Sequence, residues 1–597
     1  MLKNKKSTGS LNLIKDIFKY LSQKRKIQLF LTIVSGFASG FAEMINLSAV
    51  VPFLIIITEP TKISDIPFIS VLQNFLDIEN QNELIVPITL IFAITALFSG
   101  LLRIFNLWLN FHMSALIGND LSMEAYRKTL LKPYLFHIQS NSSAILNTMA
   151  NNIPSTVRVI ERSLIILSSI TIVISILIGL LIFNFKITSF VITLLIIVYF
   201  CFSFFSRKKL KSNSIFINKK QKKQIKVIQE SLGSIKDIII FNCKKIYLKN
   251  YKKLDKSIRV LSSENRFLST FPRYGIESLT LFMLIVSSLL LKTQDGYRDE
   301  TLVLLGVFAL AAQKLLPNLQ IIYNGVSAIR SNSQQARNVL DILSYRIPKD
   351  NFVNNLETLN FTRSIKFDNV FFKYSKQSKN VIQGLNFEFF KGENIGIIGK
   401  TGSGKSTFID ILLGLLKPDK GKLLVDGRSI YDSTNNETLS KWQNLITYVP
   451  QDIFLTDNSF LENIAYGIPS EFINTELVIQ CAKNARIHDF IESTIDGYKT
   501  FVGERGIKLS GGQIQRIGIA RALYKDSKII VFDEATSALD NQTEAEVIES
   551  IKSIKNDFTI IMIAHRLNSL KNCQRIIDID SGRIVRIISG NDLLEKE

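Results

Sequence analysis

The sequence predicts two parts: an all-α domain of six transmembrane helices, followed by a soluble α/β domain. Three observations support this prediction. Mean hydropathy is +0.20, and 47% of the 597 residues are hydrophobic, which is high for a soluble protein of this length. Long apolar runs fill the first half of the chain. From about Ile365, short β-rich runs alternate with helical ones, as in a soluble α/β domain.

Six apolar runs are long enough to cross the hydrocarbon core of a bilayer. We predict that all six are helices, because an open sheet edge is not tolerated in lipid. The last run is the least apolar, since it contains Gln313, Lys314 and Pro317. The predicted spans are residues 27–57, 84–111, 160–183, 187–206, 275–292 and 302–325.

Charge is distributed unevenly between these spans. Residues 1–26 are basic and amphipathic and hold eight Lys or Arg, whereas residues 58–83 have one lysine and five acids. The positive-inside rule therefore orients the chain with its N-terminus and its soluble domain in the cytoplasm. The net charge of +21 is explained by loops that face anionic lipid, and we expect no nucleic-acid partner. The other segments assigned to the cytoplasm are 112–160 and 207–265, and those assigned to the outside are 58–83 and 293–300.

A phosphate-binding loop is predicted at GKTGSGKST, which fits the pattern G-x-x-x-x-G-K-[ST]. It follows an apolar strand, NIGIIG, and opens an apolar helix, TFIDILLGLL. Backbone N–H groups of such a loop surround the phosphates of a nucleotide, while Lys405 adds charge and Ser406 ligates Mg²⁺. The predicted ATP-binding residues are Gly399, Lys400, Thr401, Gly402, Ser403, Gly404, Lys405, Ser406 and Thr407.

Two neighbouring acids end a second apolar strand, in KIIVFDEATSALD. Four apolar residues precede Asp533, so a buried strand would deliver this carboxylate to the Mg²⁺ ion. Glu534 can accept a proton from an attacking water molecule as a general base. Acids often end strands, but this pair lies downstream of a phosphate loop. The combination predicts a site that hydrolyses ATP with Mg²⁺.

A second glycine-rich loop occurs in VGERGIKLSGGQIQRIGIARA, a hundred residues after the first. It offers backbone N–H groups and the Ser510 hydroxyl at the start of a helix, but it has no lysine. Such a loop attracts an anion without forming a second complete nucleotide pocket. Its candidate ATP-contacting residues are Ser510, Gly511, Gly512 and Gln513.

Together these motifs resemble those of the ABC-transporter ATPases, in which LSGGQ is the signature sequence. The resemblance implies that the signature of one subunit closes over ATP held by the phosphate loop of the other, so we expect a homodimer. It also implies roles for Tyr374, which would stack on adenine, and for His565, which would contact the γ-phosphate. Gln451 would reach Mg²⁺ and the attacking water. Residues 537–540 would cross the dimer interface.

Six spans followed by this ATPase resemble an exporter-type half-transporter over the whole chain. The implied cycle is alternating access driven by ATP, in a multi-pass protein of the cytoplasmic (inner) membrane that dimerises through both domains. Bends near 135–144 and 232–241 would lie on the ATPase. The expected divisions are an amphipathic segment at 1–26, a transmembrane domain at 27–329, a linker at 330–362 and a nucleotide-binding domain at 363–597.

The cargo must be sought in the spans, where charged residues are costly and usually face a cavity or a partner. Arg103, Arg273 and Lys314 would line a cavity suited to a phosphate or pyrophosphate group. These stretches, with a segment at 65–78, resemble bacterial flippases of lipid-linked oligosaccharides. We therefore expect a lipid-linked, phosphate-bearing cargo.

Alternatives to this cargo remain open. Each of the three cations can instead pair with a local acid or extend to the interface. An exporter of another amphiphile, such as a lipid A-type lipid, a drug or a peptide, would share every ATPase residue. Two other classes are a soluble ABC-type ATPase acting on DNA or ribosomes, which would have no spans, and a receptor or channel that does not transport.

Overall fold

The computed structural model divides into two compact units. The first contains residues 1–132 and 140–346, and the second contains residues 133–139 and 347–597. The structure describes residues 10–58, 81–183, 185–292, 298–346, 359–431, 437–534, 542, 546, 558–564, 570 and 573–589. The external segment predicted at 65–78 therefore lies outside the described residues.

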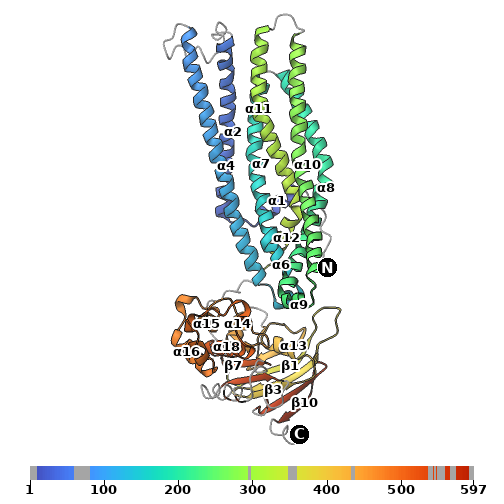
Figure 1. Ribbon diagram of the computed structural model, residues 1–597, viewed down its shortest axis with the longest axis vertical. Coiled ribbons are helices and arrows are strands. Elements are labelled where there is room, and N and C mark those ends of the chain that lie inside the picture. The colour runs from blue at the N-terminus through green and yellow to red at the C-terminus, as the bar shows by residue number, and fades with distance from the viewer. Residues whose placement is uncertain are drawn as a thin grey trace. The chain divides into compact units, whose positions relative to one another are not determined.

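The first unit is helical throughout its described part, and its long helices continue well beyond the predicted spans (Figure 1). The span predicted at 187–206, for example, is the first part of a helix of 49 residues. The long helices are α2 (Gln23–Thr58), α4 (Ile85–Leu130), α7 (Ile153–Phe183), α8 (Phe185–Gly233), α10 (Lys244–Lys292) and α11 (Arg298–Ser331). The shorter ones are α1 (Ser10–Phe18), α6 (Ser142–Asn147), α9 (Ile235–Ile240) and α12 (Ser333–Leu343).

Four helical segments among the described residues are long and apolar enough to cross a membrane. They are Gln23–Ile57, Ile85–Leu130, Ser142–Ile182 and Thr188–Gly233. The other two predicted spans, 275–292 and 302–325, fall on α10 and α11, and many side chains there lie outside the described residues. The predicted helical transmembrane domain is confirmed.

Helix α12 lies within the predicted linker. Residues 330–362 are expected to be a polar connection, and 333–343 of this stretch form a helix that packs in the first unit. Ala336, Val339 and Leu343 are buried, with the spacing of one helix face. This narrow apolar stripe is easily missed among the Asn, Ser and Gln residues that surround it.

Polar side chains and small residues join the helices of the first unit. The Asn106 side-chain amide donates to Ser35 Oγ at 3.1 Å, and Thr171 Oγ1 donates to the Gly36 carbonyl oxygen at 3.0 Å. A Cβ atom added at Gly40 would lie only 3.1 Å from the Thr171 backbone. Close backbone approach and hydrogen bonds between helices are the usual basis of helix association in lipid, where hydrophobic burial contributes little.

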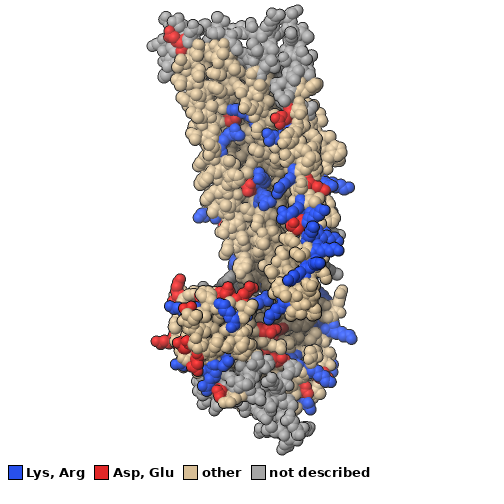
Figure 2. All heavy atoms as spheres, in the orientation of Figure 1, with Lys and Arg blue, Asp and Glu red and all other residues tan. Residues whose placement is uncertain are grey.

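The surface of this unit agrees with the predicted orientation. Figure 2 shows Lys and Arg gathered along the side of α8 and α10, where these helices extend past their predicted spans. Large apolar side chains such as Leu97, Ile104 and Phe204 are exposed on α4 and α8. A surface of this kind suits lipid rather than water.

The second unit contains two sheets, which confirms the predicted α/β domain (Figure 1). The smaller sheet is antiparallel and has the order β2-β1-β4-β5; its strands are β1 (Ser364–Phe372), β2 (Ile382–Phe390), β4 (Lys420–Val425) and β5 (Arg428–Ser429). The larger has the order β10-β9-β3-β8-β7-β6 and is parallel except for β10. Its strands are β3 (Asn394–Ile398), β6 (Ile446–Val449), β7 (Ile529–Asp533), β8 (Thr559–Ile563), β9 (Arg575–Asp580) and β10 (Arg583–Ser589).

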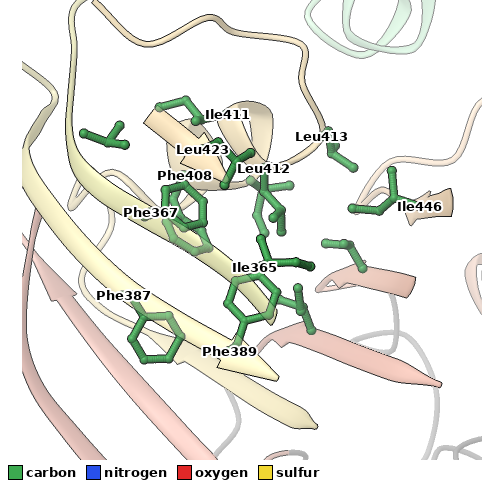
Figure 3. Close-up of a cluster of buried hydrophobic side chains, with 14 of the residues drawn as sticks. Ile365, Phe367, Phe387, Phe389, Phe408, Ile411, Leu412, Leu413, Leu423 and Ile446 are labelled. Carbon is green, nitrogen blue, oxygen red and sulfur yellow. The ribbon is translucent and has the colours of Figure 1, made fainter. Parts of the chain in front are cut away.

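A dense apolar core fixes helix α13 (Lys405–Leu412) between the two sheets. The ring of Phe408 on this helix stacks on Phe367 of β1 with a centroid separation of 4.5 Å (Figure 3). Phe389 and Ile365 are buried in the same cluster. This packing sets the position of the first turn of α13, where the predicted phosphate loop ends.

Several further helices of this unit pack around a separate apolar cluster. The longest of them is α18 (Gly511–Tyr524), which begins in the second glycine-rich loop. Its buried residues Ile517 and Ile519 hold it in this cluster. The others in this cluster are α15 (Phe460–Ile464), α16 (Thr475–Asn484) and α17 (His488–Glu492), whereas α14 (Glu437–Leu445) packs in the cluster around Phe408.

Candidate functional site

The phosphate loop lies between β3 and α13 and depends on glycine. Gly399 has φ +148°, and a Cβ atom there would lie 2.2 Å from the Ile579 carbonyl oxygen. Gly404, which precedes the first turn of α13, has φ +110°. Both conformations favour glycine, so the motif fixes the loop shape through its backbone. The loop therefore directs the N-terminus of α13 toward the position expected for phosphates.

Lys405 folds back over this loop. Its Nζ donates to the carbonyl oxygens of Gly399 and Lys400, at 2.6 and 3.0 Å. The residue is buried, and no carboxylate among the described residues lies within ion-pairing distance of its amine. Its positive charge is therefore available to an anion.

The loop also holds a buried hydroxyl that suits a phosphate. Ser403 Oγ is buried and has no hydrogen-bond partner among the described residues. A buried polar atom without a partner is unusual, because it loses its hydration without compensation. A phosphate oxygen accepting from this hydroxyl would satisfy it, so the residues present fit a nucleotide phosphate.

The two strand-end acids have different surroundings. Asp533 is the last residue of β7 and accepts a hydrogen bond of 2.9 Å from the Tyr448 hydroxyl. Burial raises the pKa of Asp533, and this hydrogen bond and the charge of Lys405 oppose that shift only in part. A Mg²⁺ ion would favour the ionised carboxylate, with Ser406 and phosphate oxygens as further oxygen ligands.

Glu534 is the next residue, and the backbone turns sharply there, away from the direction of β7. Its φ is +51°, an uncommon value for a residue with a side chain, and its backbone N–H donates to the Ile563 carbonyl oxygen of β8. The Gln451 amide donates to Glu534 Oε2 at 2.8 Å. The structure thus brings together the predicted general base and the predicted glutamine, which are 83 residues apart in the sequence.

Sequence reasoning missed Asp410, a third acid near this site. It lies on α13, and burial together with the charge of Asp533 raises its pKa to about 6. The available signal was a single acid inside the apolar helix TFIDILLGLL. Buried acids with shifted pKa values are concentrated at functional sites.

Tyr374 lies beside the start of α13. Its hydroxyl is 3.0 Å from Thr407 Oγ1, and its ring meets Phe372 edge-on. The expected aromatic residue is therefore adjacent to the phosphate loop, as stacking on adenine requires. A short segment from the first half of the chain also reaches it: helix α5 (Tyr134–Gln139) belongs to the second unit, and the Gln139 amide donates to the Tyr374 carbonyl oxygen at 2.6 Å.

The second glycine-rich loop forms an exposed helix start. Ser510 caps α18, since its hydroxyl accepts from the Gln513 backbone and Gln513 Oε1 accepts from the Ser510 backbone. Gly511 and Gly512 occupy the first turn between them. Among the described residues, no hydrogen bond or ion pair joins this loop to the phosphate loop. The other two predicted elements, His565 and residues 537–540, lie outside the described residues.

The three membrane cations are each found next to a carboxylate. Lys314 Nζ lies 2.9 Å and Arg103 Nη1 lies 3.8 Å from Oε1 of Glu43, whose side chain is 2% exposed. Ser99 donates a further short hydrogen bond to the same carboxylate. Arg273 pairs with Glu277 one turn along α10, at 3.8 Å. Each cation thus has the local carboxylate neighbour that the alternative described, and the cavity for a phosphate group stays a prediction.

Two family models match this chain. One, described as the ABC transporter transmembrane region, matches residues 29–294, and the other, described as ABC transporter, matches residues 382–537. A solved structure of a bacterial Atm1-family ABC exporter with ATP bound has a TM-score of 0.76 and covers 96% of both chains. Its sequence identity of 23% indicates a shared fold alone.

Curated relatives match a shorter part of the chain. The leukotoxin translocation ATP-binding protein LktB of a Pasteurella haemolytica-like species (strain 5943B) is 41% identical over 249 residues, which is 42% of this chain and 34% of the relative. The proteins of the same name from Mannheimia glucosida and Mannheimia haemolytica have the same identity and coverage. The chain therefore spans about a third of the length of the relatives it matches.

Proposed function

We propose that this chain, an ABC exporter by its two matched domains and its fold, hydrolyses ATP to drive export of a polypeptide across the inner membrane. The ATPase domain lies on the cytoplasmic side of a multi-pass membrane protein. The observation that supports ATP hydrolysis is the contact between Gln451 and Glu534, beside a phosphate loop whose Lys405 has no ion-pair partner among the described residues.

Different residues of the site would bind the phosphates, ligate the metal ion and activate water. Lys405 and the backbone N–H groups of its loop would hold the triphosphate, and Ser406 and Asp533 would ligate Mg²⁺, which would supply positive charge to the phosphates. The Gln451 amide holds the Glu534 carboxylate in place. Glu534 accepts the proton of the attacking water, which leaves hydroxide character on the oxygen that attacks the γ-phosphate.

A second copy of the chain completes each site. The start of α18 presents exposed backbone N–H groups without a cation, so it can close on a phosphate but cannot bind ATP alone. Two copies related by a two-fold axis would place each α18 start over the other copy's phosphate loop. The end of α9 adds support, since Ile240 and the following residue Phe241 are 75% and 76% exposed in the single chain.

Helix α5 would couple the site to transport. It follows α4 in the chain and belongs to the second unit, where Leu135 packs against the apolar core. Burial and the charges of Asp410 and Tyr374 raise the pKa of Tyr134 on this helix. A movement of Tyr374 or α13 on ATP binding would therefore displace α5, and α4 would move with it because the two helices are consecutive in the chain.

A polypeptide cargo is supported by two points. The relatives with 41% identity are named for leukotoxin translocation. The electrostatic argument for a phosphate-bearing cargo is weakened, because Glu43 and Glu277 neutralise much of the charge of Arg103, Lys314 and Arg273. The cargo test must therefore distinguish a polypeptide from three alternative cargoes: a lipid-linked oligosaccharide, a lipid A-type lipid and a drug.

The test is ATPase activity of the purified full chain in lipid nanodiscs, with Glu534→Gln as the blank. Added unfolded polypeptides, polyprenyl-pyrophosphate glycans, lipid A and drugs are compared. We expect polypeptide to stimulate hydrolysis. Stimulation by the glycolipid alone would reject the polypeptide cargo and restore the flippase hypothesis. Activity equal to the blank would reject the hydrolytic homodimer itself.

A further inference from the structure

A groove of about 400 Å³, open on one side, lies in the membrane domain between α7, α8 and α11. Helix α8 lines it from Ile192 to Ser203 with one helix face, at positions spaced by three or four residues. Helix α11 lines it with the same spacing from Leu315 to Val326, and α7 adds Leu177. At 1.5 Å per residue each face is about 16 Å long, so the groove is an open slot parallel to the helices.

The slot is apolar along most of its length and polar near one end. Among its described lining residues only Tyr199, Ser203 and Tyr323 carry a polar side-chain group. The Tyr323 hydroxyl is already 2.9 Å from Ser206 Oγ and donates to the Leu268 carbonyl oxygen. Such a lining can hold a hydrocarbon chain but cannot solvate a charged one.

Two arginines stand one helical turn beyond the polar end. Arg330 is four residues after Val326 on α11, and its Nη1 donates to Ser203 Oγ at 2.9 Å and to the Ser203 carbonyl oxygen at 3.3 Å. Arg207 is four residues after Ser203 on α8, which places it over the same helix face. The structure gives neither arginine a carboxylate partner among the described residues. They therefore differ from Arg103 and Lys314, which share the carboxylate of Glu43.

We infer that this slot binds one acyl chain of an anionic phospholipid from the cytoplasmic leaflet, with the phosphate held between Arg330 and Arg207. The apolar slot matches the chain, and the two cations match the headgroup. Arg207 directly follows the span predicted at 187–206, so the cations lie at the cytoplasmic interface, where anionic lipids are concentrated. The lipid is a bound ligand of the membrane domain, and the inference does not depend on the cargo.

The test uses tryptophan fluorescence of the full chain in vesicles. The chain has two tryptophans, Trp108 and Trp442, and the second is buried in the ATPase domain. Trp108→Phe removes the first, and Ile196→Trp places a reporter in the slot lining. Phosphatidylcholine with brominated acyl chains quenches this reporter on contact, and unbrominated phosphatidylglycerol restores its emission where it displaces the quencher.

We expect phosphatidylglycerol to displace the brominated lipid more strongly than unbrominated phosphatidylcholine does. Arg330→Gln should reduce this preference about fivefold, the effect of one basic residue at a membrane surface. Lys208→Gln is the matched control, since Lys208 lies at the same depth on α8 but on another face. It should leave the preference unchanged. Leu177→Phe should narrow the slot and weaken quenching by all lipids.

Several results would overturn the inference. Equal displacement by the two headgroups in the parent protein would reject the anionic preference. An effect of Lys208→Gln as large as that of Arg330→Gln would assign the preference to general surface charge. Displacement by millimolar inorganic phosphate would indicate a phosphate site without an acyl chain. Basal ATPase activity, measured in parallel, shows that each variant is folded.

Discussion

Two lysines in this chain, Lys405 of the ATPase and Lys314 of the membrane domain, are largely buried and have opposite electrostatic surroundings. Lys405 donates to two carbonyl oxygens and has no carboxylate partner among the described residues. Lys314 lies 2.9 Å from the buried carboxylate of Glu43. A positive charge without a counter-charge can bind an anion, whereas a paired charge chiefly holds helices together. Residue type alone does not distinguish a binding site from a structural ion pair.

The largest expected effect is on the ATPase side of this comparison. Glu534→Gln keeps the size of the side chain and its place beside Gln451 but removes the proposed general base. We expect ATP hydrolysis to fall by about 10²–10⁴-fold. The measurement is phosphate release by the full chain in nanodiscs, with ATP binding followed separately by a fluorescent analogue. Loss of binding together with hydrolysis would contradict the role as a base.

On the membrane side, Lys314→Met should destabilise the fold. The change leaves Glu43 buried with only Arg103, at 3.8 Å, and the cost of breaking such a pair is about 3 kcal/mol. Thermal unfolding in detergent is the measurement. Adding Glu43→Gln to Lys314→Met should recover much of the loss, because no uncompensated carboxylate then remains. Glu277→Gln is the control, since its pair with Arg273 is half exposed and should contribute less than about 1 kcal/mol.

Lys405→Met should weaken ATP binding with little effect on thermal stability, whereas Lys314→Met should chiefly lower thermal stability. We expect ATP affinity to fall by about 1.5–3 kcal/mol, the range for a hydrogen bond to a charged group, with little loss of thermal stability. Equilibrium binding of an ATP analogue measures the first effect, and thermal unfolding the second. Lys422→Met, at an exposed position outside the loop, serves as the control. Equal losses of stability in Lys405→Met and Lys314→Met would remove the distinction between the two lysines.

The smallest expected effect concerns Asp410, whose pKa is raised to about 6 by burial and by Asp533. Because its folded pKa is above its unfolded pKa, ionisation costs stability as pH rises from about 4 to 6. Asp410→Asn should therefore stabilise the ATPase domain at pH 7.5 more than at pH 4, by about 1 kcal/mol after allowance for its partial exposure. Unfolding followed through Trp442 measures the difference. A gain that does not vary with pH would contradict a titrating Asp410.

Local motifs determined much of the ATPase site. The phosphate loop, the strand that ends at Asp533 and the capped start of α18 are each short, contiguous segments whose residue types set their own backbone shape. Gly399 and Gly404 show this most directly, since their φ values are ones that favour glycine. Apolar length and lysine distribution likewise predicted a helical membrane domain and its orientation.

Contacts between distant residues were decided only by the tertiary structure. The sequence contains Glu43, Arg103 and Lys314 but does not indicate that three different helices bring them together. It also gave no sign that α12 is packed, that Asp410 lies near Asp533, or that Arg330 reaches Ser203. Backbone geometry follows from neighbours along the chain, while the electrostatic state of a side chain depends on whatever folding places beside it.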